Sequence, residues 1–171
     1  VEGPGLTFGE GPSWLNGKLY FSSMYFSQSW EGDPKRSRLV EMDPDGTYRY
    51  IIDGKMQTNG TMPMRNGHLA VCDMFGHRVI EVTTKGRVVR TLANRYGGKL
   101  LDGPNDLVID AKDGIYFTDP QFTPDEKKNQ PGRSVYYRKP NGKIIRVIEP
   151  DEFAMPNGVI LSPDGKTLYV N

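Results

Sequence analysis

The stretch PNDLVIDAKDGIYFTD, residues 104–119, decides the fold class of this 171-residue chain. It begins with a small polar motif, continues into a short apolar run, turns at Asp113-Gly114 and returns in a run rich in β-branched and aromatic residues. Asp-Gly between two such runs is typical of a tight β-hairpin, because these residues adopt the positive φ that the turn requires. The stretch therefore predicts two antiparallel strands that follow a polar loop.

The same order of polar loop, strand, turn and strand occurs four times along the chain. The loops are marked by Glu10, Asn59, Asn105 and Asn157, which are about 46 to 52 residues apart. Intervals of this size are typical of the four-stranded blades of a β-propeller. The hairpin turns of the four repeats are Asn16-Gly17, Asn66-Gly67, Asp113-Gly114 and Asp164-Gly165.

Further strand-like runs complete the first three repeats, at residues 38–42, 48–52, 78–82, 87–92, 134–137 and 143–148. The fourth repeat stops after its second run, at Asn171. The sequence thus predicts an all-β fold, a single domain over residues 1–171 that forms about three and a half propeller blades. Because propellers close on themselves, such a chain would expose blade faces and a strand edge. We expect a fragment, one piece of a nicked protein, or a half that pairs with a second chain.

Charge and composition narrow the classes of partner. The chain has 22 Lys and Arg against 21 Asp and Glu, a net charge of +1, and no basic run, so neither nucleic acid nor a membrane surface is a predicted partner. No apolar run approaches the ~20 residues that span a bilayer. The single cysteine, Cys72, lies in an alternating apolar run and is interpreted as a buried strand residue. The start at Val1 does not indicate the location, which is cytoplasmic or periplasmic or secreted.

The four marker residues have a shared place in a propeller. The first strand of each blade is innermost, so Glu10, Asn59, Asn105 and Asn157 are expected to converge at one mouth of the central channel. One carboxylate and several amide oxygens form a hard-oxygen set that suits Ca²⁺ better than zinc or copper. No cluster of His and Cys competes, and His77 is expected at a turn.

An alternative interpretation is ordinary turn chemistry. Asn before Gly favours turns, and on this view Asn59 and Asn157 simply start strands. Three observations favour the metal interpretation instead: Asn105 precedes Asp, Glu10 is not a turn former, and all four residues share one phase of the repeat.

These motifs resemble the gluconolactonase, or senescence marker protein, family of six-bladed β-propellers; diisopropyl fluorophosphatase and the paraoxonases are more distantly similar. The resemblance runs from about residue 6 to the end of the chain, and it is specific for the family but not for a substrate. The matching stretches are residues 10–14, 59–60, 103–107, 117–120, 155–159 and 161–170.

The resemblance implies one catalytic divalent cation at the channel mouth, Ca²⁺ or another ion such as Zn²⁺, Mn²⁺ or Mg²⁺. It places metal-ligand roles on Glu10, Asn105 and Asn157, and it adds Asn59 as a residue that binds water or a substrate oxygen. Asp119 matches a position near the pocket, although it equally suits a turn-stabilising role before Pro120. Asn105, Asn59 and Asp119 are therefore the candidate catalytic residues.

In the family, the site is completed by an aspartate of a later blade. This aspartate is a metal ligand, and it is also the usual candidate for the general base or nucleophile. That position would lie beyond Asn171. Within this chain Glu10 is then the single anionic ligand, and since calcium affinity falls with ligand charge, we expect the isolated chain to bind calcium weakly.

The resemblance implies a metal-dependent hydrolase of lactones, in which Ca²⁺ polarises the carbonyl for attack by water. The isolated chain is expected to be weak or inactive. Two alternatives remain open: a hydrolase of phosphotriesters, and a non-catalytic, ligand-binding half-propeller that assembles with a second chain or a second copy. The segment Ser23–Ser37, with Tyr25, Phe26 and Trp30, is interpreted as an aromatic lid or a packing loop, and Thr123–Arg133 as a solvated loop.

Overall fold

The computed structural model describes residues 6, 8–24, 37–54, 56–121, 128–150, 152 and 154–171. Tyr25, Phe26 and Trp30 of the predicted aromatic segment lie outside these residues, as does part of the predicted solvated loop. In the described ranges there is no helix long and apolar enough to cross a membrane.

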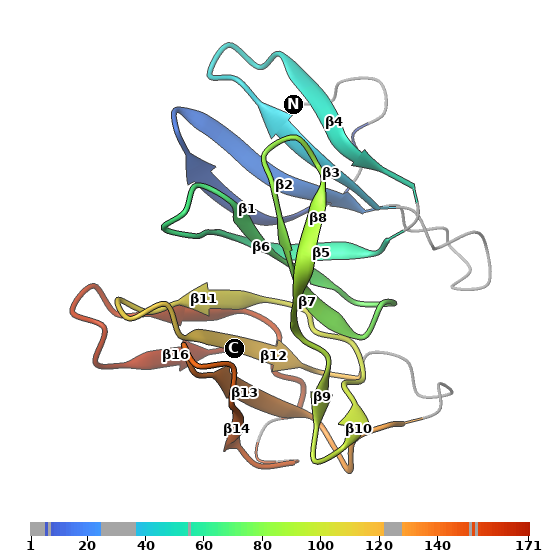
Figure 1. Ribbon diagram of the computed structural model, residues 1–171, viewed down its shortest axis with the longest axis vertical. Helices are drawn as coiled ribbons and strands as arrows, with labels where there is room; N and C mark the ends of the chain where they lie inside the picture. The colour runs from blue at the N-terminus through green and yellow to red at the C-terminus, as the bar shows by residue number, and fades with distance from the viewer. Residues whose placement is uncertain are drawn as a thin grey trace.

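Among the described residues, the blades are three four-stranded antiparallel sheets and one two-stranded sheet, each with its strands in chain order, and a second two-stranded sheet lies between blades. Figure 1 shows them following one another from the first sheet at the top to the third and fourth at the bottom. This confirms the prediction of an all-β partial propeller with three and a half blades. The blades are β1 (Phe8–Leu15), β2 (Lys18–Met24), β3 (Ser37–Met42) and β4 (Tyr48–Asp53); β5 (Thr58–Pro63), β6 (Leu69–Asp73), β7 (Arg78–Val82) and β8 (Val88–Ala93); β11 (Leu107–Ile109), β12 (Ile115–Asp119), β13 (Ser134–Arg138) and β14 (Ile144–Ile148); and β15 (Val159–Leu161) with β16 (Leu168–Val170).

A small hairpin that the sequence patterns did not predict lies between the second and third blades. Its strands are β9 (Arg95–Tyr96) and β10 (Lys99–Leu100), joined by Gly97 and Gly98. Both glycines have positive φ, 58° and 81°. A two-residue strand is too short to show the alternation by which strands are recognised in a sequence.

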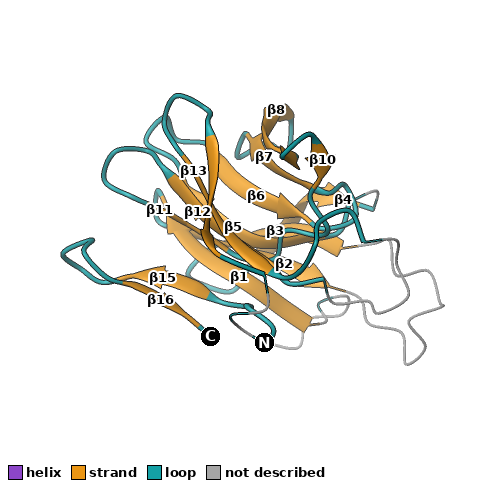
Figure 2. Ribbon diagram, turned by 90° about the horizontal axis from the view of Figure 1, so that it is seen from below, coloured by secondary structure: helices purple, strands orange, loops and turns teal. Residues whose placement is uncertain are grey.

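The first strands of the blades, β1, β5, β11 and β15, lie next to one another in this order and form the inner wall (Figure 2). The strand β6 shows how the blades pack, because its side chains alternate between two apolar cores. Leu69 and Val71 belong to the core between the first and second blades. Ala70 and Cys72 belong to the core between the second and third blades. All four side chains are therefore fully buried, which explains the continuous apolar run in the sequence.

Most of the predicted turns form with the expected backbone conformation. Asn16 and Gly17 both have positive φ, 51° and 78°, as the tightest two-residue hairpin turn requires. Gly114 differs: the positive φ of this turn, 66°, falls on Asp113. Gly114 is needed for space, since a Cβ there would lie 2.0 Å from the Tyr137 hydroxyl.

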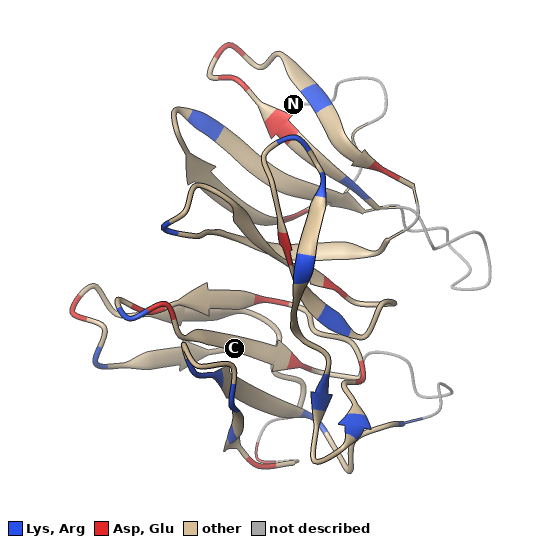
Figure 3. Cartoon of the chain, in the orientation of Figure 1, with Lys and Arg blue, Asp and Glu red and all other residues tan. Residues whose placement is uncertain are grey.

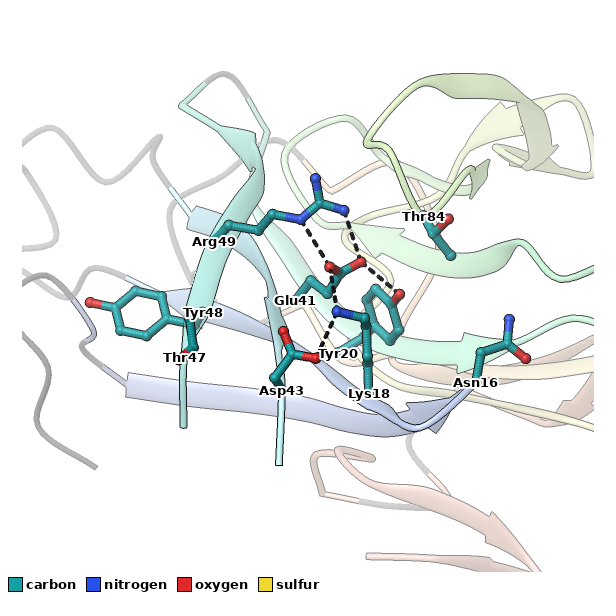
Figure 4. Close-up of a pocket in the computed structure, with 9 residues that line it drawn as sticks. All are labelled: Asn16, Lys18, Tyr20, Glu41, Asp43, Thr47, Tyr48, Arg49 and Thr84. Carbon is teal, nitrogen blue, oxygen red and sulfur yellow. Dashed lines mark hydrogen bonds and ion pairs between the residues drawn. The ribbon is translucent and has the colours of Figure 1, made fainter. Parts of the chain in front are cut away.

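A buried carboxylate, that of Glu41, contacts side chains from neighbouring strands of the first blade (Figure 4). Glu41 on β3, 5% exposed, accepts hydrogen bonds from Arg49 on β4 (Nε to Oε1, 2.9 Å) and from the Tyr20 hydroxyl on β2 (2.8 Å). Lys18 Nζ lies 3.4 Å from the same carboxylate. These contacts hold the pKa of Glu41 at about 2; the Arg49 hydrogen bond lowers it most, against the opposing effect of burial.

The second blade repeats this arrangement at the equivalent position. Glu81 on β7 accepts from Arg90 on β8 (2.7 Å) and from Asn66 (2.8 Å), and its Oε1 lies 2.6 Å from His68 Nδ1. Burial raises the pKa of Glu81, but these partners outweigh it and bring the value to about 2. In the third blade Tyr137 takes the place of the glutamate, and it donates instead to Asp110 (2.6 Å).

Charged residues of both signs occur on each four-stranded sheet (Figure 3). The most exposed of the large apolar side chains lie on the first and last sheets. Trp14 on β1 is 58% exposed, and on the last sheet the cross-strand pair Ile160 and Tyr169 is 61% and 58% exposed. The sheets at the two ends thus present apolar surface to solvent.

The low pKa values of Glu41 and Glu81 predict acid-sensitive stability. A carboxyl whose folded pKa lies near 2 and whose ordinary value is 4.5 stabilises the fold above pH 4.5, and this contribution is lost as pH falls towards 2. We expect Glu41→Gln to lower the free energy of unfolding at pH 7 by about 2–3 kcal/mol, and this difference to shrink towards zero near pH 2. Urea unfolding of both proteins at a series of pH values measures this.

The matched control is Glu149→Gln, because Glu149 is an exposed carboxylate whose ion pair with Arg146 is 3.4 Å long. It should change the free energy of unfolding by less than about 1 kcal/mol. If Glu41→Gln and the wild-type chain lose stability in parallel between pH 4.5 and 2, the assigned role of Glu41 is wrong.

Candidate functional site

An open groove of about 640 Å³ runs along the inner strands, and Glu10, Asn105 and Asn157 all line it. These residues come from the first, third and fourth blades, so the propeller symmetry brings together residues that are far apart in sequence. Asn59 is not among the lining residues, although Thr61 of the same strand is. The structure therefore gathers the three predicted metal ligands at one groove, while their metal-binding role stays a prediction.

Glu10 and Asn59 differ from the predicted placement in one respect. The sequence placed all four marker residues in loops before the first strands, but Glu10 lies within β1 and Asn59 within β5. Each strand carries a bulge at this point, with register shifts between Glu10 and Ser13 and between Thr58 and Thr61. A bulge redirects side chains without ending the strand, so strand pairing extends past the motif.

Asn105 and Asn157 lie two residues before β11 and β15, as predicted. The Asn105 N–H donates to the Thr118 carbonyl (2.9 Å), and its carbonyl accepts from the Gly60 N–H (2.8 Å). The Asn157 N–H donates to the Asn171 carbonyl (2.7 Å). Both backbones are therefore held by strand-like bonds, while the side chains differ: Asn105 is 4% exposed and Asn157 is exposed.

Hydroxyl groups connect the site residues of one blade to the preceding blade. Ser22 Oγ donates to the Asn59 carbonyl (2.6 Å), and Thr118 Oγ1 donates to the Asn157 carbonyl (2.7 Å). Ser22 and Thr118 hold equivalent positions on the second strands of the first and third blades, and Cys72 holds that position in the second. In the second blade the carbonyl of the next site residue, Asn105, accepts a hydrogen bond from the Gly60 N–H rather than from a hydroxyl group.

Two glycines allow the inner strands to approach closely. A Cβ on Gly60 would lie 2.7 Å from Asp106 Oδ1, and a Cβ on Gly11 would lie 2.4 Å from Gly60 Cα. Gly11 also has φ of 53° within the bulge. Gly11 is thus required by both space and backbone conformation, and Gly60 by space alone.

A second carboxylate, Asp106, lines the groove with Glu10. Burial raises the pKa of Asp106, while the N–H groups of Val159 and Leu107 lower it; Val159 N donates to Asp106 Oδ2 at 2.9 Å. Burial also raises the pKa of Glu10, and the negative charge of Asp106 raises it further. The sequence pattern predicts no role for Asp106, and its position directly after Asn105 is the one indication that the sequence offers.

Asp119, a candidate catalytic residue, is 1% exposed and is not among the groove's lining residues. Its carboxylate accepts from the backbone N–H groups of Asp102 (3.0 Å) and Gly103 (2.5 Å), so it holds the loop that leads to Asn105. Burial raises its pKa to about 6, against the lowering effect of these two N–H groups. These contacts match the structural alternative, and a catalytic role for Asp119 stays a prediction.

Neither histidine takes part in the groove. His77 lies in the turn between β6 and β7 with φ of 54°, and its Nδ1 is 2.9 Å from the Asp102 carbonyl. Across the residues that the structure describes, no three side chains of His, Cys, Asp or Glu form a cluster that would hold a metal. Any metal at the groove would therefore depend on amide oxygens as well as carboxylates.

The family model described as the SMP-30/gluconolactonase/LRE-like region matches residues 8–171 of the chain. The chain belongs to this family. Three known proteins illustrate the likeness. A gluconolactonase from Zymomonas mobilis is 29% identical over 176 residues, which cover 97% of this chain and 49% of the relative.

Solved structures agree with this assignment. A gluconolactonase from Xanthomonas campestris, described as important in glucose secondary metabolic pathways, is 30% identical with a TM-score of 0.82, over 97% of this chain and 55% of its own. A luciferin-regenerating enzyme is 18% identical with a TM-score of 0.67, over 97% and 52%, and shows a shared fold alone. This chain thus spans about half the length of the relatives that it matches.

Substitutions of Thr118 test how much a hydrogen bond between blades contributes to stability at the site. Thr118 is fully buried, accepts from the Asp106 N–H (3.1 Å) and donates to the Asn157 carbonyl. Thr118→Val should lower the free energy of unfolding by about 1–3 kcal/mol, because it leaves these two groups without their partner. Thr118→Ser keeps the hydroxyl and should recover much of the loss.

Chemical denaturation of the two variants measures this difference. If Thr118→Val were as stable as the unmodified chain, the role assigned to the hydroxyl would be wrong.

Proposed function

We propose that this chain supplies metal-binding and substrate-positioning residues of a metal-dependent lactone hydrolase. The observation that carries the proposal is that Glu10, Asn105 and Asn157, from three different blades, line one groove. The family supports the reaction class, because similar proteins in Zymomonas mobilis and Xanthomonas campestris are gluconolactonases.

The chemistry of the groove fits a hard divalent cation. Its candidate donors are carboxylate and amide oxygens, which Ca²⁺ and Mg²⁺ prefer. The two carboxylates Glu10 and Asp106 face it, and none of its described lining residues is Lys, Arg or His. A cation would therefore enter a site whose negative charge is not balanced by basic side chains. Ca²⁺ is the proposed ion, and Zn²⁺, Mn²⁺ and Mg²⁺ are alternatives.

A bound cation supplies Lewis-acid polarisation of the lactone carbonyl and stabilises the oxyanion that develops there. Glu10 would be the anionic ligand, and Asn105 and Asn157 the neutral oxygen ligands. Their backbones are already held by hydrogen bonds to Thr118 and Asn171, so little reorganisation is needed when they bind. Asn59 would hold a water molecule or a substrate oxygen through its amide.

The proton of the attacking water needs a base that these residues do not supply. Asp106 faces the groove, but its Oδ2 accepts the Val159 N–H and so holds β15 in place. The family resemblance assigns the base to an aspartate of a later blade. Complete catalysis is therefore proposed for a propeller that contains these blades together with the remaining ones.

Glu10→Gln provides the central test. It removes the anionic ligand with little change in shape, so we expect calcium binding by this chain, measured by calorimetry, to weaken about tenfold or more. In a full propeller that contains these residues, lactone hydrolysis should fall in parallel and should stop when a chelator is added. Glu149→Gln, an exposed carboxylate away from the groove, is the control.

Unchanged calcium binding and unchanged turnover in Glu10→Gln would contradict the mechanism. A phosphotriester assay run beside the sugar-lactone assay separates the two hydrolase classes, since the preferred substrate has the higher kcat/KM. Calcium binding without turnover of either substrate would instead favour the non-catalytic, ligand-binding alternative.

We also propose that further blades cover the two end sheets, provided by more of the same polypeptide or by a second copy of the chain. Trp14, Ile160 and Tyr169 support this, because exposed apolar side chains on opposite ends are suited to packing against other sheets.

Light scattering should show the 19.2 kDa chain associating into a larger species. Ile160→Ser should shift it towards the monomer.

Phe75→Ser is the matched control, since Phe75 is an exposed aromatic residue in the turn between β6 and β7. A monomer at all concentrations for the unmodified chain would argue against a second copy as the covering partner.

A further inference from the structure

The turn between β6 and β7 places a thioether beside the site. The N–H of Met74 donates to the Gln57 carbonyl (2.9 Å), and the Met74 carbonyl accepts from the His77 N–H (3.0 Å). These two bonds anchor the backbone at Met74 to the segment before β5 and to the turn itself. The position of the half-buried Met74 side chain is therefore determined by well-held backbone.

The Met74 sulfur contacts the side-chain amides of two neighbouring blades. Asn59 Nδ2 donates to Sδ at 3.3 Å, and Asn105 Nδ2 lies 4.0 Å from the same atom. Thioether sulfur is a weak acceptor, but both asparagines are almost fully buried, at 3% and 4% exposed, where an NH₂ group without a partner is costly. One sulfur atom is thus shared by two site asparagines.

This contact decides which end of each amide is free. The NH₂ group of an asparagine cannot bind a metal ion, whereas Oδ1 binds a metal or accepts from water. Because Nδ2 of Asn59 and Asn105 is directed at Met74, their Oδ1 atoms are turned away from it. Among the described residues, neither Oδ1 accepts a hydrogen bond in the structure.

We propose that Met74 is a positioning residue that sets the amide orientation of Asn59 and Asn105, leaving both carbonyl oxygens available to a cation or water. The benefit of this orientation to metal binding rests on the proposed function. The orientation of the two amides itself can be measured separately. Without the sulfur, each buried NH₂ loses its acceptor, and the two flipped orientations of the amide become closer in free energy.

Three variants of the full chain test the role. Met74→Leu removes the acceptor and keeps an apolar side chain of similar volume. Met74→Gln keeps the length and restores an acceptor through its carbonyl oxygen. Met64→Leu makes the same change as the first variant at a partly buried methionine that packs on the core between the second and third blades.

The first measurement is the side-chain NH₂ signals of Asn59 and Asn105 in ¹⁵N spectra. Met74→Leu should shift these signals and speed their hydrogen exchange, and the effect should be larger for Asn59, whose amide nitrogen is 0.7 Å closer to the sulfur (3.3 against 4.0 Å). Met74→Gln should restore slow exchange, and Met64→Leu should leave both signals unchanged.

The second measurement is titration of the same proteins with calcium chloride. We expect Met74→Leu to bind about three- to tenfold more weakly, with Met74→Gln close to the unmodified chain, because a partner that orients a ligand affects metal affinity. Circular dichroism at the same temperature confirms that each variant is folded.

The two measurements separate the possible failures. If the Asn59 and Asn105 signals are the same in Met74→Leu and the unmodified chain, Met74 is a packing residue and the inference is wrong. If the signals change but no chain binds calcium, Met74 orients the amides as inferred and the proposed metal function fails. If Met64→Leu produces equal changes, the effect is general loosening of the core, which also overturns the inference.

Discussion

The structure depends on the close approach of the inner strands. The Gly60 N–H donates to the Asn105 carbonyl at 2.8 Å, a side chain at Gly60 would collide with Asp106, and a side chain at Gly11 would collide with Gly60. Because these contacts join backbone to backbone, the first three blades have a fixed spacing where their first strands meet. The positions of Glu10, Asn59 and Asn105 follow from this spacing, since each lies within one residue of a strand contact.

Away from this wall, the blades are held by two different kinds of interaction. Apolar side chains fill the space between sheets, and β6 contributes to the cores on both of its faces. Within each of the first two blades, a buried glutamate on the third strand accepts a charged hydrogen bond from an arginine on the fourth strand. The first kind is insensitive to pH, whereas the second loses its contribution in acid because a protonated glutamate no longer pairs with arginine.

A comparison of Glu41 with Glu10 and Asp106 illustrates how the environment of a carboxylate determines its chemistry. Glu41 is buried and paired with the more exposed Arg49 and Lys18, and its pKa is low. Glu10 and Asp106 are near each other without a basic partner in the groove, and the pKa of each is raised. The charge of Glu41 is thus balanced within the chain. Glu10 and Asp106 instead keep their negative charge available to a partner of opposite charge, which is the property that a cation site requires.

The amino-acid sequence by itself determined the strands of the blades, most of the turns and the number of blades, because alternation, Asn-Gly and Asp-Gly turns and the repeat are local properties of the chain. It also indicated Glu10, Asn105 and Asn157 as one set, since residues at the same phase of a propeller repeat face the same channel. It placed Glu10 and Asn59 in loops, because the bulges that keep them within strands depend on pairing with β2 and β6. Only the tertiary structure revealed Asp106 beside Glu10, Asp119 beneath the loop to Asn105, and Met74 against two amides. Each of these contacts joins segments whose distance is set by the packing of side chains between and within blades, and that packing leaves no pattern in the sequence.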